Sequence, residues 1–205
     1  MKKSALVILC SLFLALFETY ARENKEEPRK GQIGITFSSF GENNVIQFQN
    51  LEGAASYNGD RFYTLGISYL YKLNRTFDVE TGIEYSNHKI IIEPNLPPQM
   101  DNSPYGASFS LINIPVTLRV NFLKYCFING GLLLDIDAGT SGPIDSQTGI
   151  GTVLGLGLKY DFKCGVTAFV NPYSKLHSLI SFSSDRYPQR LMESGFRFGL
   201  MYNMK

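Results

Sequence analysis

FRFGLMYNMK, residues 196–205, closes the chain and contains the pattern that decides the fold. Alternate positions from Phe196 to Met204 are apolar, and the positions between them include Arg197 and Asn203. A period of two describes a β-strand with one apolar face. An unpaired apolar edge promotes aggregation, whereas a closed transmembrane barrel pairs its last strand with its first. The stretch therefore predicts the final strand of a membrane barrel.

The same stretch resembles the terminal signal by which bacterial outer-membrane barrels are recognised for assembly. The resemblance rests on Gly199, Tyr202 and Met204. That signal usually ends on an aromatic residue, whereas this chain ends on Met204 and Lys205. We expect these residues to act as the assembly signal, with the barrel-assembly machinery as a partner.

The beginning of the chain predicts export. Lys2 and Lys3 precede an apolar run from Ala5 to Phe17, which is shorter than the roughly 20 residues of a spanning helix and typical of a secretory signal peptide. We expect residues 1–21 to be the signal peptide, cleaved after Ala21, and residues 22–30 to be a periplasmic lead-in. A lipid anchor on Cys10 is the alternative, but the residue before it, Leu9, is not small.

Composition favours one all-β domain, predicted for residues 31–205. The chain is rich in Tyr, Phe and Gly, as β-proteins are. Without residues 1–21, basic residues fall from 19 to 17 and acidic residues from 18 to 17, so no basic face for nucleic acid is indicated. Cys126 and Cys164 remain near predicted short turns, and the sequence leaves open whether they form a disulfide.

Alternation predicts eight antiparallel strands in an up-and-down transmembrane barrel. The remaining length allows about 23 residues for each strand and its connection, and ten strands would also be possible. The alternating segments are residues 32–37, 63–73, 77–86, 112–122, 126–137, 154–162, 166–179 and the stretch after 190. The long connections are 41–60, 93–106, 139–149 and 181–190, and the short turns lie at 74–75, 123–124 and 163–165. Outer-membrane barrels alternate short periplasmic turns with long outer loops in this way.

Aromatic residues near the short turns and the C-terminus predict an interfacial ring. The expected girdle is Tyr71, Phe77, Phe122, Tyr125, Tyr160, Phe162 and Tyr202, with Phe127 at the same level. Such rings gather at membrane–water interfaces. A soluble eight-stranded calyx is the structural alternative, in which the apolar rows would point inward.

Two segments resemble the small outer-membrane β-barrel (porin-like, PorT-like) family of Bacteroidota. One is Leu111-Ile112-Asn113-Ile114-Pro115-Val116-Thr117-Leu118, and the other is the Gly130-Gly131 strand after a short turn. The resemblance covers about residues 31–205 and implies an outer-membrane location. It implies no activity, because most of these proteins are described as barrels of unknown role, some linked to secretion or adhesion.

The polar rows predict a lumen filled with paired charges. The inward rows carry Asp78, Glu80, Glu84, Asp135 and Glu193 beside Lys72, Arg119, Lys159, Lys175 and Arg197. The lumen of an eight-stranded barrel is just wide enough for side chains to fill, and unpaired buried charges are costly. We expect a salt-bridged plug rather than an ion-conducting lumen.

The sequence indicates no enzyme, cofactor or metal site. His88 and His177 fall toward the outer rim with no partner spacing, and Ser178 would point away from His177 on a regular strand. Asp135 and Asp137 share a face but supply too few ligands for calcium. We therefore expect a non-enzymatic barrel that anchors a structure or presents its outer loops to an extracellular or periplasmic protein partner. The alternatives are a narrow porin and a rim-sited lipid-modifying hydrolase.

Overall fold

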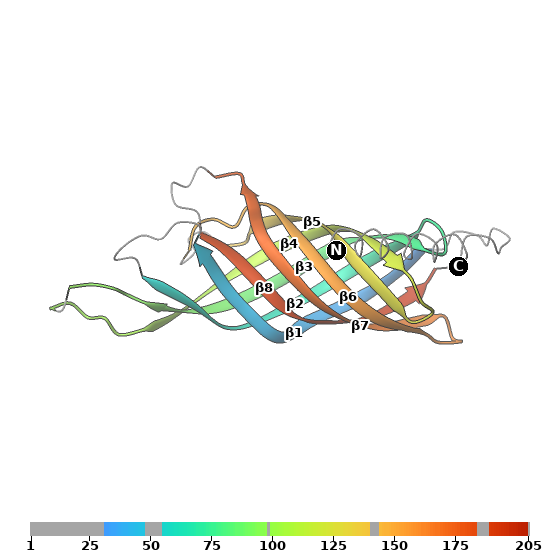
Figure 1. Ribbon diagram of the computed structural model, residues 1–205, viewed down its shortest axis with the longest axis horizontal. Helices are drawn as coiled ribbons and strands as arrows, with labels where there is room; N and C mark the ends of the chain where they lie inside the picture. Colours follow the sequence, from blue (N-terminus) through green and yellow to red (C-terminus); the bar gives the residue numbers. More distant parts are fainter. Residues whose placement is uncertain (1–30, 48–54, 98, 140–143, 184–188, 205) are drawn as a thin grey trace, which may run out of the picture.

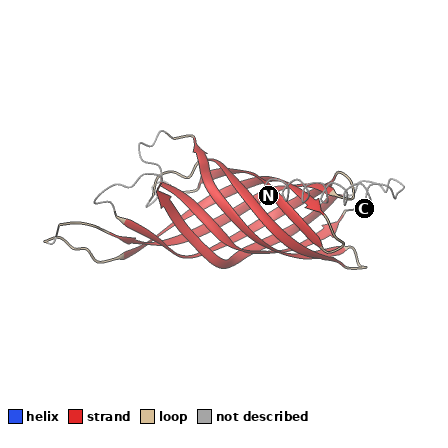
Figure 2. Ribbon diagram, viewed as in Figure 1, coloured by secondary structure: helices blue, strands red, loops and turns tan. Residues whose placement is uncertain are grey.

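Eight antiparallel strands form one closed ring (Figures 1 and 2). The computed structural model describes residues 31–47, 55–97, 99–139, 144–183 and 189–204. The strands are β1 (Gly31–Gln47), β2 (Ser56–Lys72), β3 (Phe77–Glu93), β4 (Tyr105–Asn121), β5 (Cys126–Asp137), β6 (Gly149–Asp161), β7 (Val166–Ser181) and β8 (Gln189–Asn203). The prediction of eight strands rather than ten is confirmed. The predicted signal peptide and lead-in lie outside the described residues.

The first and last strands close the ring. Ile33 of β1 is registered with Tyr202 of β8 on one side and with Tyr69 of β2 on the other. The apolar C-terminal strand therefore has a partner along its length, which removes the exposed edge that its sequence would otherwise present. Within the described ranges, no helix is long and apolar enough to cross a membrane.

The barrel has an apolar outside and a polar inside. Ile35, Leu154 and Ile67 are 61–64% exposed on the outer face, whereas Glu80 and Asp135 are at most 1% exposed. A soluble calyx would have the opposite arrangement, with its apolar rows packed inside. The distribution is that of a barrel whose outer wall faces lipid.

The outer apolar band on β2 is slightly shorter than the band of about 25 Å that is typical of outer-membrane barrels. On β2 it runs from Tyr71 near the short turn to Tyr63, eight residues along the strand. At about 3.3 Å per residue and a tilt of about 40°, this distance spans ~20 Å across the membrane. Beyond Tyr63, β2 continues with Asp60 and Arg61, which form an exposed ion pair with N–O distance 3.5 Å.

The predicted connection at 41–60 is wrong in its extent. Residues 41–47 belong to β1 and residues 56–60 to β2, and the remainder lies outside the described residues. The segment is polar because these strand ends extend past the apolar band, where a strand no longer needs a lipid-facing row. Figure 1 shows β3 and β4 also extending at this end, with their green connection projecting beyond the ring. The other long connections and the three short turns match the strand limits closely.

Candidate functional site in the barrel lumen

The inward row of β3 gives the order of the groups along the lumen. From the short-turn end outward, it contains Asp78, Glu80, Glu84, Ser86, His88, Ile90 and Ile92. Each of these side chains is at most 4% exposed. The lumen therefore changes from charged to apolar toward the outer mouth.

Glu80 joins two arginines from opposite parts of the wall. Its Oε2 accepts a hydrogen bond of 2.5 Å from Arg119 Nη2, and its Oε1 accepts one from Arg197. The Arg119 guanidinium also lies 4.2 Å from the centre of the Phe127 ring. Charge-assisted bonds and cation–π contacts of this kind are strong where water is excluded.

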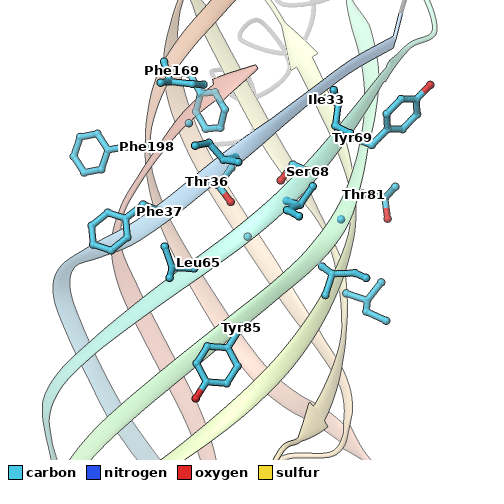
Figure 3. A pocket seen from close by; sticks show the side chains of 18 of the residues that line it. Ile33, Thr36, Phe37, Leu65, Ser68, Tyr69, Thr81, Tyr85, Phe169 and Phe198 are labelled. Atoms are coloured by element: carbon cyan, nitrogen blue, oxygen red, sulfur yellow. The ribbon is translucent and has the colours of Figure 1, made fainter. Parts of the chain in front are cut away.

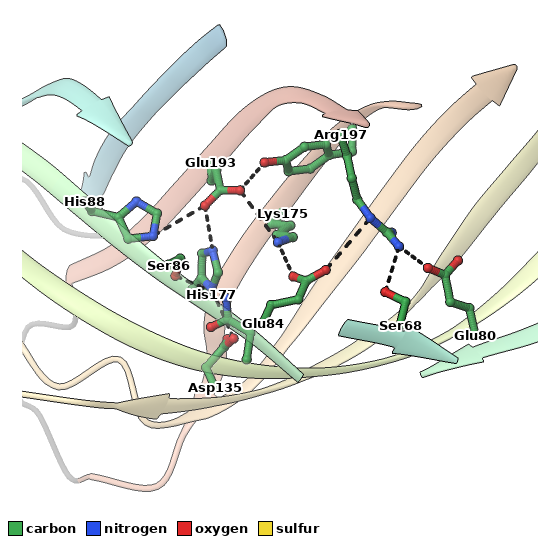
Figure 4. Close-up of polar contacts among 12 residues, drawn as sticks. Ser68, Glu80, Glu84, Ser86, His88, Asp135, Lys175, His177, Glu193 and Arg197 are labelled. Carbon is green, nitrogen blue, oxygen red and sulfur yellow. Dashed lines mark hydrogen bonds and ion pairs between the residues drawn. The ribbon is translucent and has the colours of Figure 1, made fainter. Parts of the chain in front are cut away.

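Lys175 lies between two further carboxylates (Figure 4). Its Nζ donates to Glu84 Oε2 at 2.7 Å and lies 3.6 Å from Glu193 Oε1. The Tyr173 hydroxyl donates to the same Glu193 oxygen. Arg197 Nε lies 3.9 Å from Glu84 Oε1, so this group and the Glu80 group form one continuous network.

Both histidines of the chain meet at the outer end of this network. His88 Nε2 lies 3.4 Å, and His177 Nε2 3.7 Å, from Glu193 Oε2. His177 Nδ1 lies 3.1 Å from Asp135 Oδ1. All four side chains are fully buried. The sequence showed no partner spacing for either histidine, because spacing along the chain does not show which strands face each other across a barrel.

A bulge in β7 brings His177 and Ser178 to the same side of the wall. The β6–β7 register shifts between Ile150 and Thr152, and Ser178 has a φ of 46°. Both residues are buried, so the expectation that they point to opposite faces is wrong. The Ser178 amide donates to Asp135 Oδ2 at 3.0 Å, while its hydroxyl donates to the Thr148 carbonyl.

Asp78 and Lys159 are linked through an amide rather than paired directly. The Asn121 side chain donates to Asp78 Oδ2 at 2.8 Å, and its oxygen accepts from Lys159 Nζ at 2.6 Å. With this link, nine of the ten charged residues predicted for the lumen have a described hydrogen-bond or ion-pair partner. The tenth, Lys72, is half-buried at the short-turn end of β2. The sequence predicted these lumen residues because each occupies the polar position in a strand whose polar and apolar residues alternate.

Apolar clusters lie on both sides of the network. The inner cluster contains Leu70, Phe127, Phe169 and Met201, and the outer cluster contains Ile90, Ile92, Phe109, Leu111, Ile144 and Leu191. Placing Phe127 in the lipid-facing girdle was wrong, because it is 0% exposed and packs inside. Gly157 provides its space, since a Cβ there would come within 2.1 Å of the ring.

The β5–β6 connection covers the outer mouth. Ile144 packs in the outer cluster, and Gln147 is fully buried. The Gln147 side chain donates to the Gln189 carbonyl at 2.9 Å and accepts from the Leu191 amide at 3.0 Å. This connection therefore ties to β8 across the lumen opening.

The remaining predicted residues lie at the surface or the rim. Tyr71, Tyr125, Tyr160, Phe162 and Tyr202 are 38–53% exposed, and Phe77 and Phe122 are half-buried. Tyr125 and Tyr160 stack with ring centres 6.0 Å apart, and Tyr160 contacts Phe162. These residues therefore present rings on the outer wall at the short-turn end.

The residues of the expected assembly signal lie on or beside β8. Tyr202 and Met204 are exposed on the outer wall. Glycine is also required at position 199 for packing, because a Cβ there would come within 2.2 Å of the Phe169 ring.

In the described part of the chain, the two cysteines are not bonded to each other, and Asp135 and Asp137 do not share a ligand site. Cys126 and Cys164 are free thiols. Asp135 is engaged by His177 and Ser178, whereas Asp137 accepts from the Gly139 amide at 3.1 Å. The two carboxylates therefore serve different partners.

A groove of about 1200 Å³ lies along the outer wall (Figure 3). Phe37, Leu65, Tyr85 and Phe198 line it, together with Gly66, Gly82 and Gly199, which have no side chains to fill it. The groove lies within the apolar band of the outer wall.

Comparisons with known proteins agree with this architecture. No protein-family model and no curated protein sequence matches the chain. Among solved structures, the outer membrane protein OprG from Pseudomonas aeruginosa aligns with a TM-score of 0.56 and 10% identity, covering 87% of this chain and 97% of OprG. The outer membrane protein AlkL, solved in DMPC lipid bilayers, aligns with a TM-score of 0.53 and 14% identity, covering 89% and 97%. At these identities the similarity establishes the barrel fold alone.

Proposed function

We propose that this protein is a non-conducting, non-enzymatic outer-membrane barrel that anchors an outward-facing surface for a protein partner. The filled lumen is the observation that carries the proposal. Charged groups from Glu80 to Glu193 pair with one another, and apolar clusters lie inside the lumen at both ends of this paired group. A continuous water path needs a wider barrel than eight strands usually provide.

The outer wall supports a location in the outer membrane after signal-peptide cleavage. Its apolar band comes close to the height of about 25 Å that is typical of outer-membrane barrels, and aromatic rings lie at its short-turn end. Short turns usually face the periplasm, so both chain ends belong there. The C-terminal residues Gly199, Tyr202 and Met204 are proposed to be read by the barrel-assembly machinery, and outer-membrane lipid surrounds the band.

The outward extension supports a role in presenting a surface. β1 to β4 each contain 17 residues, whereas crossing a membrane takes about 9–11. In the β3–β4 connection, the Asn102 side chain bonds both the amide and the carbonyl of Leu96. Hydrogen bonds from the Ser103 hydroxyl and amide hold the pKa of Asp101 below its usual value. Leu96 and Met100 are 45% and 59% exposed in this connection, so an extracellular partner could reach both side chains.

Membership in the small outer-membrane barrel family of Bacteroidota is part of the proposal. It rests on the segment from Leu111 to Leu118 and on Gly130-Gly131. A narrow porin is the alternative function. We favour closure because Arg119, Lys175 and Arg197 are each bonded to carboxylates inside the lumen.

Cysteine labelling in intact cells tests the orientation and the exposed surface. A Gln99→Cys variant places a thiol in the exposed β3–β4 connection, and native Cys164 lies exposed in the short turn at the opposite end. A membrane-impermeant maleimide should label the variant but not the wild-type protein. Permeabilising the outer membrane should then make Cys164 reactive. Labelling of wild-type Cys164 in intact cells, or failure to label the thiol introduced by Gln99→Cys, would contradict the proposal.

A further inference from the structure

We propose that His88, His177 and Glu193 bind a divalent transition-metal ion, with Zn²⁺ as the best match, inside the barrel. One ligand atom from each residue lies within 4.8 Å of the others. The three residues come from β3, β7 and β8, so strands on opposite sides of the ring meet at this point. Imidazole and carboxylate together are a ligand set that suits zinc.

The two distances from Glu193 to the histidines are close to those of a tetrahedral ion, and all three ligand atoms lie within 4.8 Å of one another. Glu193 Oε2 lies 3.4 Å from His88 Nε2 and 3.7 Å from His177 Nε2. Ligands bound to zinc at about 2.0–2.1 Å in a tetrahedron stand about 3.3–3.4 Å apart. Binding would require the two histidine nitrogens and the Glu193 oxygen to close from within 4.8 Å to this spacing, with the fourth position left to a ligand from outside the protein.

Neighbouring residues orient two of the ligands. Asp135 accepts from His177 Nδ1, so the proton of that imidazole lies on Nδ1 and the lone pair of Nε2 faces Glu193. Metal-bound histidines in proteins almost always have such a carboxylate or carbonyl partner. Tyr173 and Lys175 engage Glu193 Oε1, which leaves Oε2 for the ion.

The bulge in β7 positions Asp135. The Ser178 amide reaches Asp135 Oδ2 because Ser178 adopts a left-handed backbone conformation. A serine in that conformation stores strain that ordinary folding does not require. Gly151 leaves the space for the carboxylate, since a Cβ there would lie 2.6 Å from Asp135 Oδ2.

The buried atoms of this cluster are otherwise unsatisfied. His88 Nδ1 and Nε2, His177 Nε2 and Glu193 Oε2 have no hydrogen-bond partner among the described residues. The His88 ring is held between Phe62 and Phe109, with ring centres 5.9 and 5.4 Å away. Buried polar atoms without partners are costly, and a bound ion satisfies three of these four.

Local charge also favours a cation. In the continuous network, the four carboxylates of Glu80, Glu84, Asp135 and Glu193 face the three cationic side chains of Arg119, Lys175 and Arg197. One negative charge is therefore left over, and it lies at the Asp135 and Glu193 end, where the ion would bind. Because the outer apolar cluster covers the site, the ion would act structurally, as a link between opposite walls.

Metal analysis of tag-free protein, refolded in detergent from a metal-free unfolded state, tests the proposal. With Zn²⁺ present, the wild-type protein should retain about one equivalent after chelator washing and unfold at a higher temperature. X-ray absorption should show nitrogen and oxygen at about 2.0 Å, including two imidazoles. Retention below about a tenth of an equivalent, or sulfur ligands from Cys126 or Cys164, would overturn the proposal.

Variants locate the ion. His88→Phe keeps the ring stack and Glu193→Gln keeps the bond to Tyr173, and both should lose the bound zinc. Asp78→Asn is the matched control, because Asp78 is a buried lumen carboxylate at the short-turn end, held by Asn121 and away from the three ligands, so it should leave zinc retention unchanged. Equal retention by Glu193→Gln and the wild type would contradict the assignment. Should His88→Phe fail to fold, visible d–d absorption of wild-type protein refolded with Co²⁺ decides, and absence of a tetrahedral spectrum overturns the site.

Discussion

At the residue scale, packing inside the lumen requires small residues beside large side chains. A Cβ on Gly157 would meet the Phe127 ring, whereas a Cβ on Gly130 would lie 3.4 Å from Leu154 Cδ1, an ordinary contact. Gly157→Ala should lower the free energy of unfolding by about 1–3 kcal/mol through overpacking. Gly130→Ala should be neutral or slightly stabilising. Urea unfolding in detergent or lipid measures both, and equal effects would mean that the Phe127 ring is not confined.

Glu80 should be the carboxylate on which the network depends most. Glu80→Gln would remove the carboxylate that pairs with Arg119 and leave Arg197 with Glu84 alone, and breaking a buried pair costs about 3–5 kcal/mol. Asp60→Asn is the control, because the exposed Asp60–Lys89 pair, with N–O distance 3.8 Å, should contribute less than about 1 kcal/mol. The same unfolding measurement compares them. A Glu80→Gln protein as stable as Asp60→Asn would show that the lumen is hydrated and screened.

The sequence predicts which face of the sheet a residue lies on better than it predicts which residues it contacts. Alternation placed Leu156 outside and Glu80 inside, because a strand has a strict period of two. It could not bring His88, His177 and Glu193 together, since their contact depends on the register of three strands across a closed ring. It also failed at Ser178, where the bulge breaks the period, and at Phe127, whose ring occupies the space left by Gly157 on the neighbouring strand.

At the element scale, the apolar band fixes the depth of each strand. On β6, Leu156 lies four residues from both Tyr160 and Thr152, so it should face the bilayer centre. Leu156→Arg should cost about 2–4 kcal/mol and impair assembly, whereas Thr152→Arg should cost about 0–1 kcal/mol near the interface. Refolding into lipid vesicles, followed by urea titration, measures both variants.

Aromatic substitution at the same position separates the membrane barrel from a soluble calyx. Leu156 is 55% exposed on the outer wall, so Leu156→Phe and Leu156→Trp should be tolerated there. In a packed core, each would lose about 1–3 kcal/mol from overpacking. If both variants unfolded as readily as Leu156→Arg, the apolar row would have to point inward.

The limits of the strands were predictable only inside the band. Short turns and apolar rows located the short-turn ends of all eight strands closely. The outer ends of β1 and β2 were missed, because residues 41–47 and 56–60 are polar strand outside the apolar band. The change from apolar to polar residues marks where the strand leaves the membrane. In these two segments it was interpreted as the end of the strand.

At the scale of the whole molecule, closure is the feature that connects fold and function. The ring closes through β1 and β8, so the sheet has no free edge. Inside it, the network from Asp78 to Glu193 fills the centre, and the Gln147 connection covers the outer mouth. The outer parts of β1 to β4, which extend past the apolar band, then hold the outer surface in place. They do not widen a pore.

Single-protein conductance in planar lipid bilayers tests this account most directly. Insertion is first verified by flotation with lipid vesicles, and a general diffusion porin in the same bilayers is the positive control. The account predicts that inserted wild-type protein gives no steady ionic current, because the charged side chains of the lumen are bonded to one another. Reproducible channels of uniform size, whose number rises with protein concentration, would contradict it.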